Sequence, residues 1–319
     1  MVKHSLHYPI RRLFGFFQSV ILLLVLILII SSISPAFFSY SNFSNLLRQL
    51  SINLIVAAGM TFIILAGEID MSVGSVLVLT AIASAKLFSI LPVFPAMLIS
   101  LCIGPCFGFF HGILVTKGNV PSFIVTLGTL MIGRSAAFLI TQGKVLRNIP
   151  LELKTLNNTT VFGLPAVILL IIVLYGICYI ILSQTSYGKK IVATGTDANI
   201  AHLSGIHTDR IKISAFVMCS LFASFAGIVI IARIGAIQAH TGNGMELESI
   251  AAVVIGGTSL TGGEGGIIRT VIGVFIIGFM RNAVNLMHMS SFWQDFITGS
   301  IILLAALLDT TRKKISRIM

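Results

Sequence analysis

The chain has 319 residues, of which 56% are hydrophobic and only 10% are charged, with a formal net charge of +11 at pH 7. A mean hydropathy of +1.03 excludes a soluble globular protein. The basic residues are spread over short connections and not gathered in one soluble patch with interleaved aromatic residues, so we expect no nucleic-acid partner. The alternating pattern of a membrane β-barrel is absent. The composition therefore predicts an all-α polytopic membrane protein.

Apolar stretches near the length needed to cross the roughly 30 Å hydrocarbon core recur along the chain. We expect about ten transmembrane helices within a single permease domain over residues 1–319. Their approximate ranges are 16–34, 50–66, 70–91, 93–116, 120–141, 161–183, 211–232, 247–261, 267–287 and 290–308. The eighth stretch is short and rich in glycine, so we expect a tilted or broken helix there. The sequence gives no sign of the interrupted helices of an inverted-repeat transporter.

The basic residues predict the orientation of these spans. Arg11 and Arg12 precede the first stretch, and Pro35 after it disfavours cleavage of a signal peptide, so we expect a retained first helix. An even number of spans places both termini on one side of the membrane. Most bases in the connections fall on that side, including Lys189, Lys190 and the tail over 312–317. Both termini are therefore expected to be cytoplasmic.

A short polar run from Gly67 to Ser75 separates two strongly apolar stretches. An ionised carboxylate near bilayer depth is costly unless it faces protein, water or a partner charge, which indicates a functional site. A tight turn with its acids wet at the membrane surface explains the run equally well. The residues that we single out as a signature turn or gate are Glu68, Asp70, Ser72, Gly74 and Ser75.

The connection over 184–212 is too hydrophilic to span the membrane and has an amphipathic core over 199–206. This pattern predicts a short helix on the cytoplasmic membrane surface that ends at Gly205. In a channel or a secondary carrier such a loop is a connector. In a transporter that is driven by a separate motor, it is the surface on which the motor docks.

The sequence predicts a transport subunit and not an enzyme. A phosphate-binding Gly-x-x-x-x-Gly-Lys-Ser/Thr motif is absent, so this chain is not expected to hydrolyse ATP through a P-loop. The glycine cluster over 256–266 follows an apolar stretch and lacks the lysine, which favours close packing or a broken helix. The four cysteines lie in apolar runs and are expected to be small buried residues. We expect no disulfide, metal site or cofactor.

Two arginines, Arg134 and Arg281, lie inside apolar spans and need a partner charge or water. The first partners to consider are Asp70, Glu68 and Asp295, or each arginine for the other; snorkelling to the membrane surface is the alternative. In the fourth span, glycines at four-residue spacing predict close helix packing, and Pro105 predicts a kink. These glycines are Gly104, Gly108 and Gly112.

Three long motifs, in this order, are specific to one family. They are 59–62 leading into 69–75, 203–206 with 211–213, and 250–263. On these motifs the chain resembles the permease subunit of ribose-type monosaccharide ABC importers, the bacterial family that also serves xylose, arabinose and galactose. The resemblance covers nearly the whole chain. It departs from the family at Ala198, where a coupling acid is usual, and at Glu68, where glycine is usual.

The resemblance implies an assembly in the bacterial inner membrane. A second permease copy or a paralogue, two ATP-binding subunits and a periplasmic sugar-binding protein are the implied partners, with membrane lipid around them. The loop over 197–206 would then be the coupling helix that contacts the ATPase. The residues to which this role extends are Asp197, Ala198, His202, Leu203, Ser204, Gly205 and Ile206.

The expected function is import of a monosaccharide through this chain. A sugar presents hydroxyl groups, so weakly polar side chains on the spans are candidates for the pathway, although membrane helices also use such residues to bond each other. The candidates are Asn53, Thr61, Thr126, Thr129 and Asn285, together with Ser72 and Ser75. A nucleoside or branched-chain amino-acid permease is the nearest alternative. An ion-coupled secondary transporter is the alternative from a different class.

Overall fold

The computed structural model describes residues 7–290, 292–294, 296–300 and 303. Within this part the chain is helical apart from its connections and one small β-hairpin. The helices are α1 (His7–Ile33), η1 (Pro35–Phe38), α2 (Tyr40–Leu65), α3 (Val73–Leu87), α4 (Val93–Leu101), α5 (Ile103–Thr116), α6 (Ser122–Thr141), α7 (Leu151–Asn158), α8 (Ala166–Tyr179), η2 (Ile180–Gln184), α9 (Ser186–Thr196), α10 (Ala198–Leu203), α11 (Thr208–Ile234), α12 (Met245–Ile255) and α13 (Ile267–Leu286). The hairpin pairs β1 (Thr160–Val161) with β2 (Leu164–Pro165) in antiparallel register.

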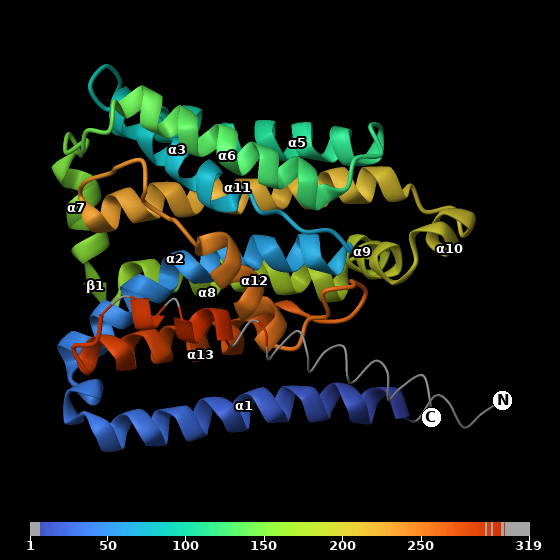
Figure 1. Cartoon of the computed structure of the whole chain (residues 1–319), viewed down its shortest axis with the longest axis horizontal. Coiled ribbons are helices and arrows are strands. Elements are labelled where there is room, and N and C mark those ends of the chain that lie inside the picture. The colour runs from blue at the N-terminus through green and yellow to red at the C-terminus, as the bar shows by residue number, and fades with distance from the viewer. Residues whose placement is uncertain (1–6, 291, 295, 301–302, 304–319) are drawn as a thin grey trace.

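Most of the long helices lie side by side along one axis (Figure 1). α7 and β1 lie at one end of the bundle, whereas α9 and α10 lie at the other. In the part of the chain that the structure describes, 6 helices are long and apolar enough to cross a membrane. They are α2, α4 with α5, α6, α8 with η2, α11 and α13. This supports a multi-pass membrane protein, because a helix needs about 20 apolar residues to cross the hydrocarbon core.

The predicted number of ten spans and the cytoplasmic termini stay predictions. The last expected span, 290–308, lies partly outside the described residues, and the basic tail over 312–317 lies wholly outside them. The third span, expected over 70–91, is shorter than predicted, since α3 has only 15 residues. α12 has 11 residues. At 1.5 Å per residue these helices are about 22 Å and 16 Å long, well short of the roughly 30 Å core.

The two short helices both begin inside the bundle (Figure 1). After α2 the chain turns back through residues 66–72 and enters α3 partway along the bundle. After α11, which runs in the opposite direction to α2, it turns back through 235–244 and enters α12 in the same way. The short α12 agrees with the tilted or broken helix expected at the eighth stretch. The short α3 was not expected, since the sequence shows no sign that this span is interrupted. Each short helix is apolar, so in sequence it resembles part of an ordinary span.

Helix α5 packs closely on α11, as the glycine spacing predicts. A Cβ atom on Gly108 would lie 2.5 Å from the Phe216 carbonyl oxygen, and one on Gly112 would lie 2.7 Å from the Ile213 Cα. One on Gly104 would collide with the Ser220 carbonyl oxygen. The helix breaks between α4 and α5, close to the predicted kink, because Pro105 has no N–H for the preceding turn.

The four cysteines divide into two pairs. Cys178 and Cys219 are buried, as expected, whereas Cys102 and Cys106 are exposed. Residues two apart on a helix point about 200° from each other, because each residue turns the helix by about 100°. Cys102 and Cys106 each lie two residues from Gly104, which faces α11. The expectation of burial is therefore wrong for these two cysteines.

The contact between α5 and α11 gives a first testable prediction. Gly108→Leu forces a side chain against the α11 backbone, and we expect it to lower the free energy of unfolding by about 1–3 kcal/mol or more. Thermal unfolding in detergent measures the loss. Gly128→Leu is the matched control, since a Cβ atom on Gly128 has no neighbour within 4 Å. Equal melting temperatures for the two variants would contradict the predicted close packing.

Candidate functional site

Asp70 lies in the interior of the bundle at the beginning of α3. Its carboxylate is 0% exposed. One oxygen accepts hydrogen bonds from the backbone N–H of Ser72 at 2.8 Å and from the Ser72 hydroxyl at 2.6 Å. The other accepts a bond of 3.4 Å from Ser220 and lies 3.9 Å from Nδ1 of His111. The alternative of an acid wet at the membrane surface is therefore wrong for Asp70.

Glu68 has a different partner from Asp70. Its carboxylate lies 2.6 Å from Nζ of Lys212, near the beginning of α11. The next residue, Ile69, donates its backbone N–H to the Ser122 hydroxyl at the beginning of α6. Residues 66–72 are thus tied to two other helices. Glu68 itself forms one of these links, so its ion pair helps to hold residues 66–72 in place.

Gly74 marks the place where three elements come together. A Cβ atom at this position would collide with the Glu246 carboxylate and lie 2.7 Å from Nη2 of Arg134 and 2.8 Å from the Gly242 carbonyl oxygen. At the next residue, Ser75, α6 approaches α3 so closely that a Cβ atom on Gly133 would lie 2.8 Å from the Ser75 side chain. The small residues of the signature run therefore allow α3, α6 and the beginning of α12 to meet.

Arg134 holds the backbone that leads into α12. Its guanidinium donates to the carbonyl oxygens of Thr241 and Gly242, both at 2.7 Å, and to that of Ala239 at 3.4 Å. Nη2 lies 3.9 Å from the Glu246 carboxylate. The partners expected from the sequence, Asp70 and Glu68, are wrong for this arginine. Arg134 neutralises the first turn of α12 and fixes the chain that precedes it.

Arg281 of α13 pairs with Glu248 of α12 at 2.6 Å. The side chains are 19% and 6% exposed, so the pair is largely shielded from solvent. Asn53 of α2 donates to the second Glu248 oxygen at 3.3 Å. Asp70 and Glu68 were also expected as partners of Arg281, and this prediction is wrong. The third expected partner, Asp295, lies outside the described residues. Acids in the first turn of a helix are also favoured by the helix dipole.

The sequence analysis did not identify Glu246, Glu248 or His111. The two acids lie within four residues after a Gly-Asn-Gly run and precede an apolar stretch, which is a signal for the beginning of a helix. The eighth span was expected to begin at residue 247. Glu246 therefore fell in the preceding loop and Glu248 at the beginning of the span, so the two acids were not recognised as a pair. His111 gives no local signal, since it stands alone in an apolar helix.

Most of the other pathway candidates bond to helices. The hydroxyls of Thr61 and Thr270 are 2.7 Å apart and join α2 to α13. Thr126 and Thr129 donate to carbonyl oxygens of their own helix. Asn285 accepts a hydrogen bond from Gln294. Among these candidates, the structure brings Asn53 alone into contact with the charged groups at the beginning of α12.

The loop over 184–212 folds into α9 and α10, and α10 ends just before Gly205 as predicted. Asp197 caps α10 by accepting hydrogen bonds from the N–H groups of Asn199 at 2.9 Å and Ile200 at 3.0 Å. Gly205 has a positive φ of 83°, which favours glycine after a helix. Leu203 is 86% exposed. In Figure 1, α10 projects beyond the end of the bundle.

Helix α9 connects α10 to the interior through close backbone contacts. A Cβ atom on Gly262 would lie 2.7 Å from the Gly195 carbonyl oxygen and 2.7 Å from the Cα of Gly67. Gly263 donates its N–H to the Leu65 carbonyl oxygen at 3.1 Å. The glycine cluster therefore serves close packing, as expected. It joins the end of α2, the end of α9 and the loop before α13 at one point.

The beginning of α9 is also buried against α11. The hydroxyls of Tyr187 and Ser214 are 2.7 Å apart. Burial raises the pKa of Tyr187 above its ordinary value. The phenol therefore stays neutral at physiological pH and keeps its hydrogen bond.

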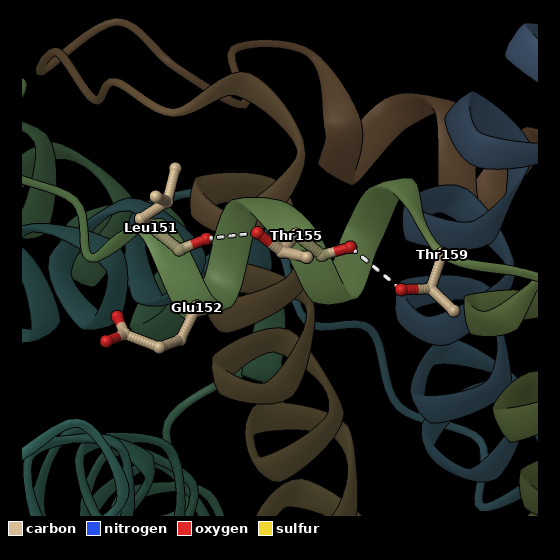
Figure 2. A pocket seen from close by; sticks show the side chains of 4 residues that line it. All are labelled: Leu151, Glu152, Thr155 and Thr159. Atoms are coloured by element: carbon tan, nitrogen blue, oxygen red, sulfur yellow. Dashed lines mark hydrogen bonds between the residues drawn. The ribbon is translucent and has the colours of Figure 1, made fainter.

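A surface depression on α7 is a poor candidate for the site (Figure 2). Leu151, Glu152, Thr155 and Thr159 line it, and the hydroxyls of both threonines donate to carbonyl oxygens of the same segment at 2.9 Å. It lies at the far end of the bundle from α10 (Figure 1). Among the described residues, no group of three or more His, Cys, Asp or Glu side chains is placed to hold a metal ion.

Comparison with known proteins adds independent information. Residues 42–306 match the family described as branched-chain amino acid transport system / permease component. The ribose import permease protein RbsC of Haemophilus influenzae is 39% identical, with 97% of each chain covered. RbsC of Escherichia coli K12 is 38% identical over 93% of this chain and 94% of its own. The autoinducer 2 import system permease protein LsrC of Yersinia pseudotuberculosis is 35% identical over 88% and 80%. No solved structure matches.

Proposed function

Because this chain belongs to the family of branched-chain amino acid transport system permease components, we propose that it is the permease subunit of an ATP-driven importer for a monosaccharide. The observation that carries the proposal is the 39% identity to a ribose import permease over 97% of both chains. This similarity extends over nearly the whole chain and favours a sugar over a nucleoside or an amino acid. Another relative is named as an autoinducer 2 import permease, so a small solute other than a sugar is the second candidate.

The proposed assembly contains two permease chains, two ATP-binding subunits and a periplasmic sugar-binding protein in a bacterial inner membrane. The end of the bundle with α9 and α10 would face the cytoplasm. Lys189 and Lys190 lie at this end, in agreement with the bias of basic residues towards the cytoplasm. In this orientation α7 and the β-hairpin lie on the opposite side of the membrane from α10.

The exposed α10 is the proposed contact with the ATPase. ATP binding would stabilise one arrangement of the motor subunits, and a change in their position would shift the population of permease conformations. The link from α10 into the membrane is physical: α9 meets the residues after α2 through Gly195 and Gly67. Gly67 belongs to the segment 66–72, which follows α2 and carries Glu68 and Asp70. Their proposed role is to gate the path when α9 moves.

The function is tested by uptake into vesicles that contain the permease, its ATPase and its binding protein. We expect accumulation of labelled ribose that requires ATP and the binding protein. Leu203→Glu places a charge on the most exposed apolar residue of α10, and we expect it to reduce ATP-dependent uptake at least about tenfold, the effect of losing ~1.4 kcal/mol of coupling. The change leaves the bundle untouched because Leu203 is 86% exposed.

Leu151→Glu is the matched control, since Leu151 is 73% exposed and begins α7, at the opposite end of the bundle from α10. We expect this variant to transport at the rate of the unchanged protein. Uptake that a proton or sodium gradient drives without ATP would contradict the proposal and favour an ion-coupled carrier. Equal uptake by both variants would leave the importer intact but remove α10 as the motor contact.

A further inference from the structure

The segment from Gln238 to Gly244 is polar although it runs into the helix bundle. It connects the end of α11 to the beginning of α12, in the middle of the bundle (Figure 1). Gln238, His240 and Asn243 are exposed in the single chain. Lipid offers no hydrogen bonds, so non-helical backbone at this depth occurs where it is covered by protein or lines a water-filled cavity. The exposed side of this segment is therefore unsuited to lipid.

At the end of this segment a carboxylate oxygen has spare hydrogen-bonding capacity. Glu246 is 8% exposed. Its Oε1 accepts a hydrogen bond of 3.3 Å from the Gly244 N–H. Its Oε2 is buried and accepts no hydrogen bond from the residues that the structure describes. Arg134 stays 3.9 Å away because its N–H groups are directed to the carbonyl oxygens of Thr241 and Gly242.

The charges around this oxygen select the class of ligand. Arg134 and Arg281 offset the two acids in the first turn of α12, so the cluster has little net charge to offer a charged solute. A carboxylate accepts hydrogen bonds from hydroxyl groups, and an amide such as that of Asn243 both donates and accepts them. An anionic solute would be repelled by Glu246. The combination fits a neutral solute with neighbouring hydroxyl groups.

We propose that Glu246 and Asn243 form a binding site for the hydroxyl groups of a neutral solute, at the point where the transport path passes the beginning of α12. The site rests on the proposed function, which requires such a path. Arg134 is a positioning residue, because it holds the backbone at residues 239–242 without offering its own N–H groups to the solute. Gly74 keeps α3 close enough to form the floor of the site.

The first test asks whether the site is wet and occupied, without using the motor. Asn243→Cys is made in the full complex after Cys102 and Cys106, which are exposed, are replaced by serine. We expect a charged, water-soluble thiol reagent to label the new cysteine and saturating ribose to slow the labelling. Leu139→Cys, at an apolar position on α6 that is 75% exposed, is the control and is expected to stay unlabelled. A cysteine at 243 that stays unlabelled overturns the proposal.

The second test measures ribose uptake by the assembled importer. We expect Glu246→Gln and Asn243→Ala each to lower the initial rate roughly tenfold, the equivalent of ~1.4 kcal/mol. Glu152→Gln, an exposed acid on α7, is expected to leave the rate unchanged. Unchanged uptake in both Glu246→Gln and Asn243→Ala overturns the site while the importer stands. Absence of ATP-dependent uptake in the unchanged protein overturns the proposed function instead, and the labelling result still decides the site.

Discussion

Asp70→Ala is expected to lower the free energy of unfolding by about 3 kcal/mol or more, because it removes the acceptor of three buried hydrogen-bond donors. The donors left without this acceptor are the Ser72 N–H and the hydroxyls of Ser72 and Ser220. A buried donor without an acceptor costs about 1–3 kcal/mol. Thermal unfolding in detergent, followed by circular dichroism, measures this effect.

Two controls test whether the loss of stability comes from the lost hydrogen-bond acceptor and from its burial. Asp70→Asn keeps an oxygen for the Ser72 donors, so we expect a smaller loss than for alanine. Asp209→Ala removes an acid that pairs with Lys117 at 2.8 Å, but these side chains are 47% and 68% exposed. An exposed pair contributes about 0–1 kcal/mol. A loss for Asp70→Ala no larger than that for Asp209→Ala would show that the buried cluster does not stabilise the fold.

Arg281→Met is expected to lower the free energy of unfolding by about 3–5 kcal/mol, because it leaves Glu248 charged, buried and without its cation. Glu248 would then keep only the Asn53 amide as a donor among the described residues. The loss would loosen the contact between α12 and α13 and disturb the beginning of α12. Ribose uptake should therefore fall together with thermal stability, which distinguishes this variant from Asn243→Ala.

The double variant Arg281→Met with Glu248→Gln tests the cause. Replacing both members of a buried pair by neutral residues is often close to neutral for stability, so we expect the double variant to recover most of the loss. Lys144→Met removes an exposed base and serves as the control. A double variant less stable than Arg281→Met would mean that the charge pair is not the source of the effect.

Several features of the fold were predictable from local patterns. The apolar stretches predicted the six long helices, and the glycine spacing at 104, 108 and 112 predicted the face of α5 that contacts α11. The amphipathic run predicted α10 and its end before Gly205. Each of these patterns lies within one helix or one turn. The physical cause is local hydropathy or backbone sterics, which a linear reading captures.

The charge pairs were not predictable in the same way. Arg134 and Arg281 needed partners, yet their partners, Glu246 and Glu248, lie in the first turn of α12, which is distant in sequence from Arg134 and more than thirty residues before Arg281. The nearest candidate by charge alone was Asp70, which lies among Ser72, Ser220 and His111 instead. Which charges meet depends on which helices are neighbours and at what depth each one begins.

The sequence by itself determined that this protein crosses a membrane with several helices, that it carries a polar loop with an exposed α10, and which family it belongs to. These properties follow from hydropathy summed along the chain and from motifs of adjacent residues. The tertiary structure alone decided that α3 and α12 begin inside the bundle and that Asp70 is buried. It also decided that each arginine has an acid on another helix. Burial and charge pairing depend on contacts between distant segments, and hydropathy along the chain contains no information about such contacts.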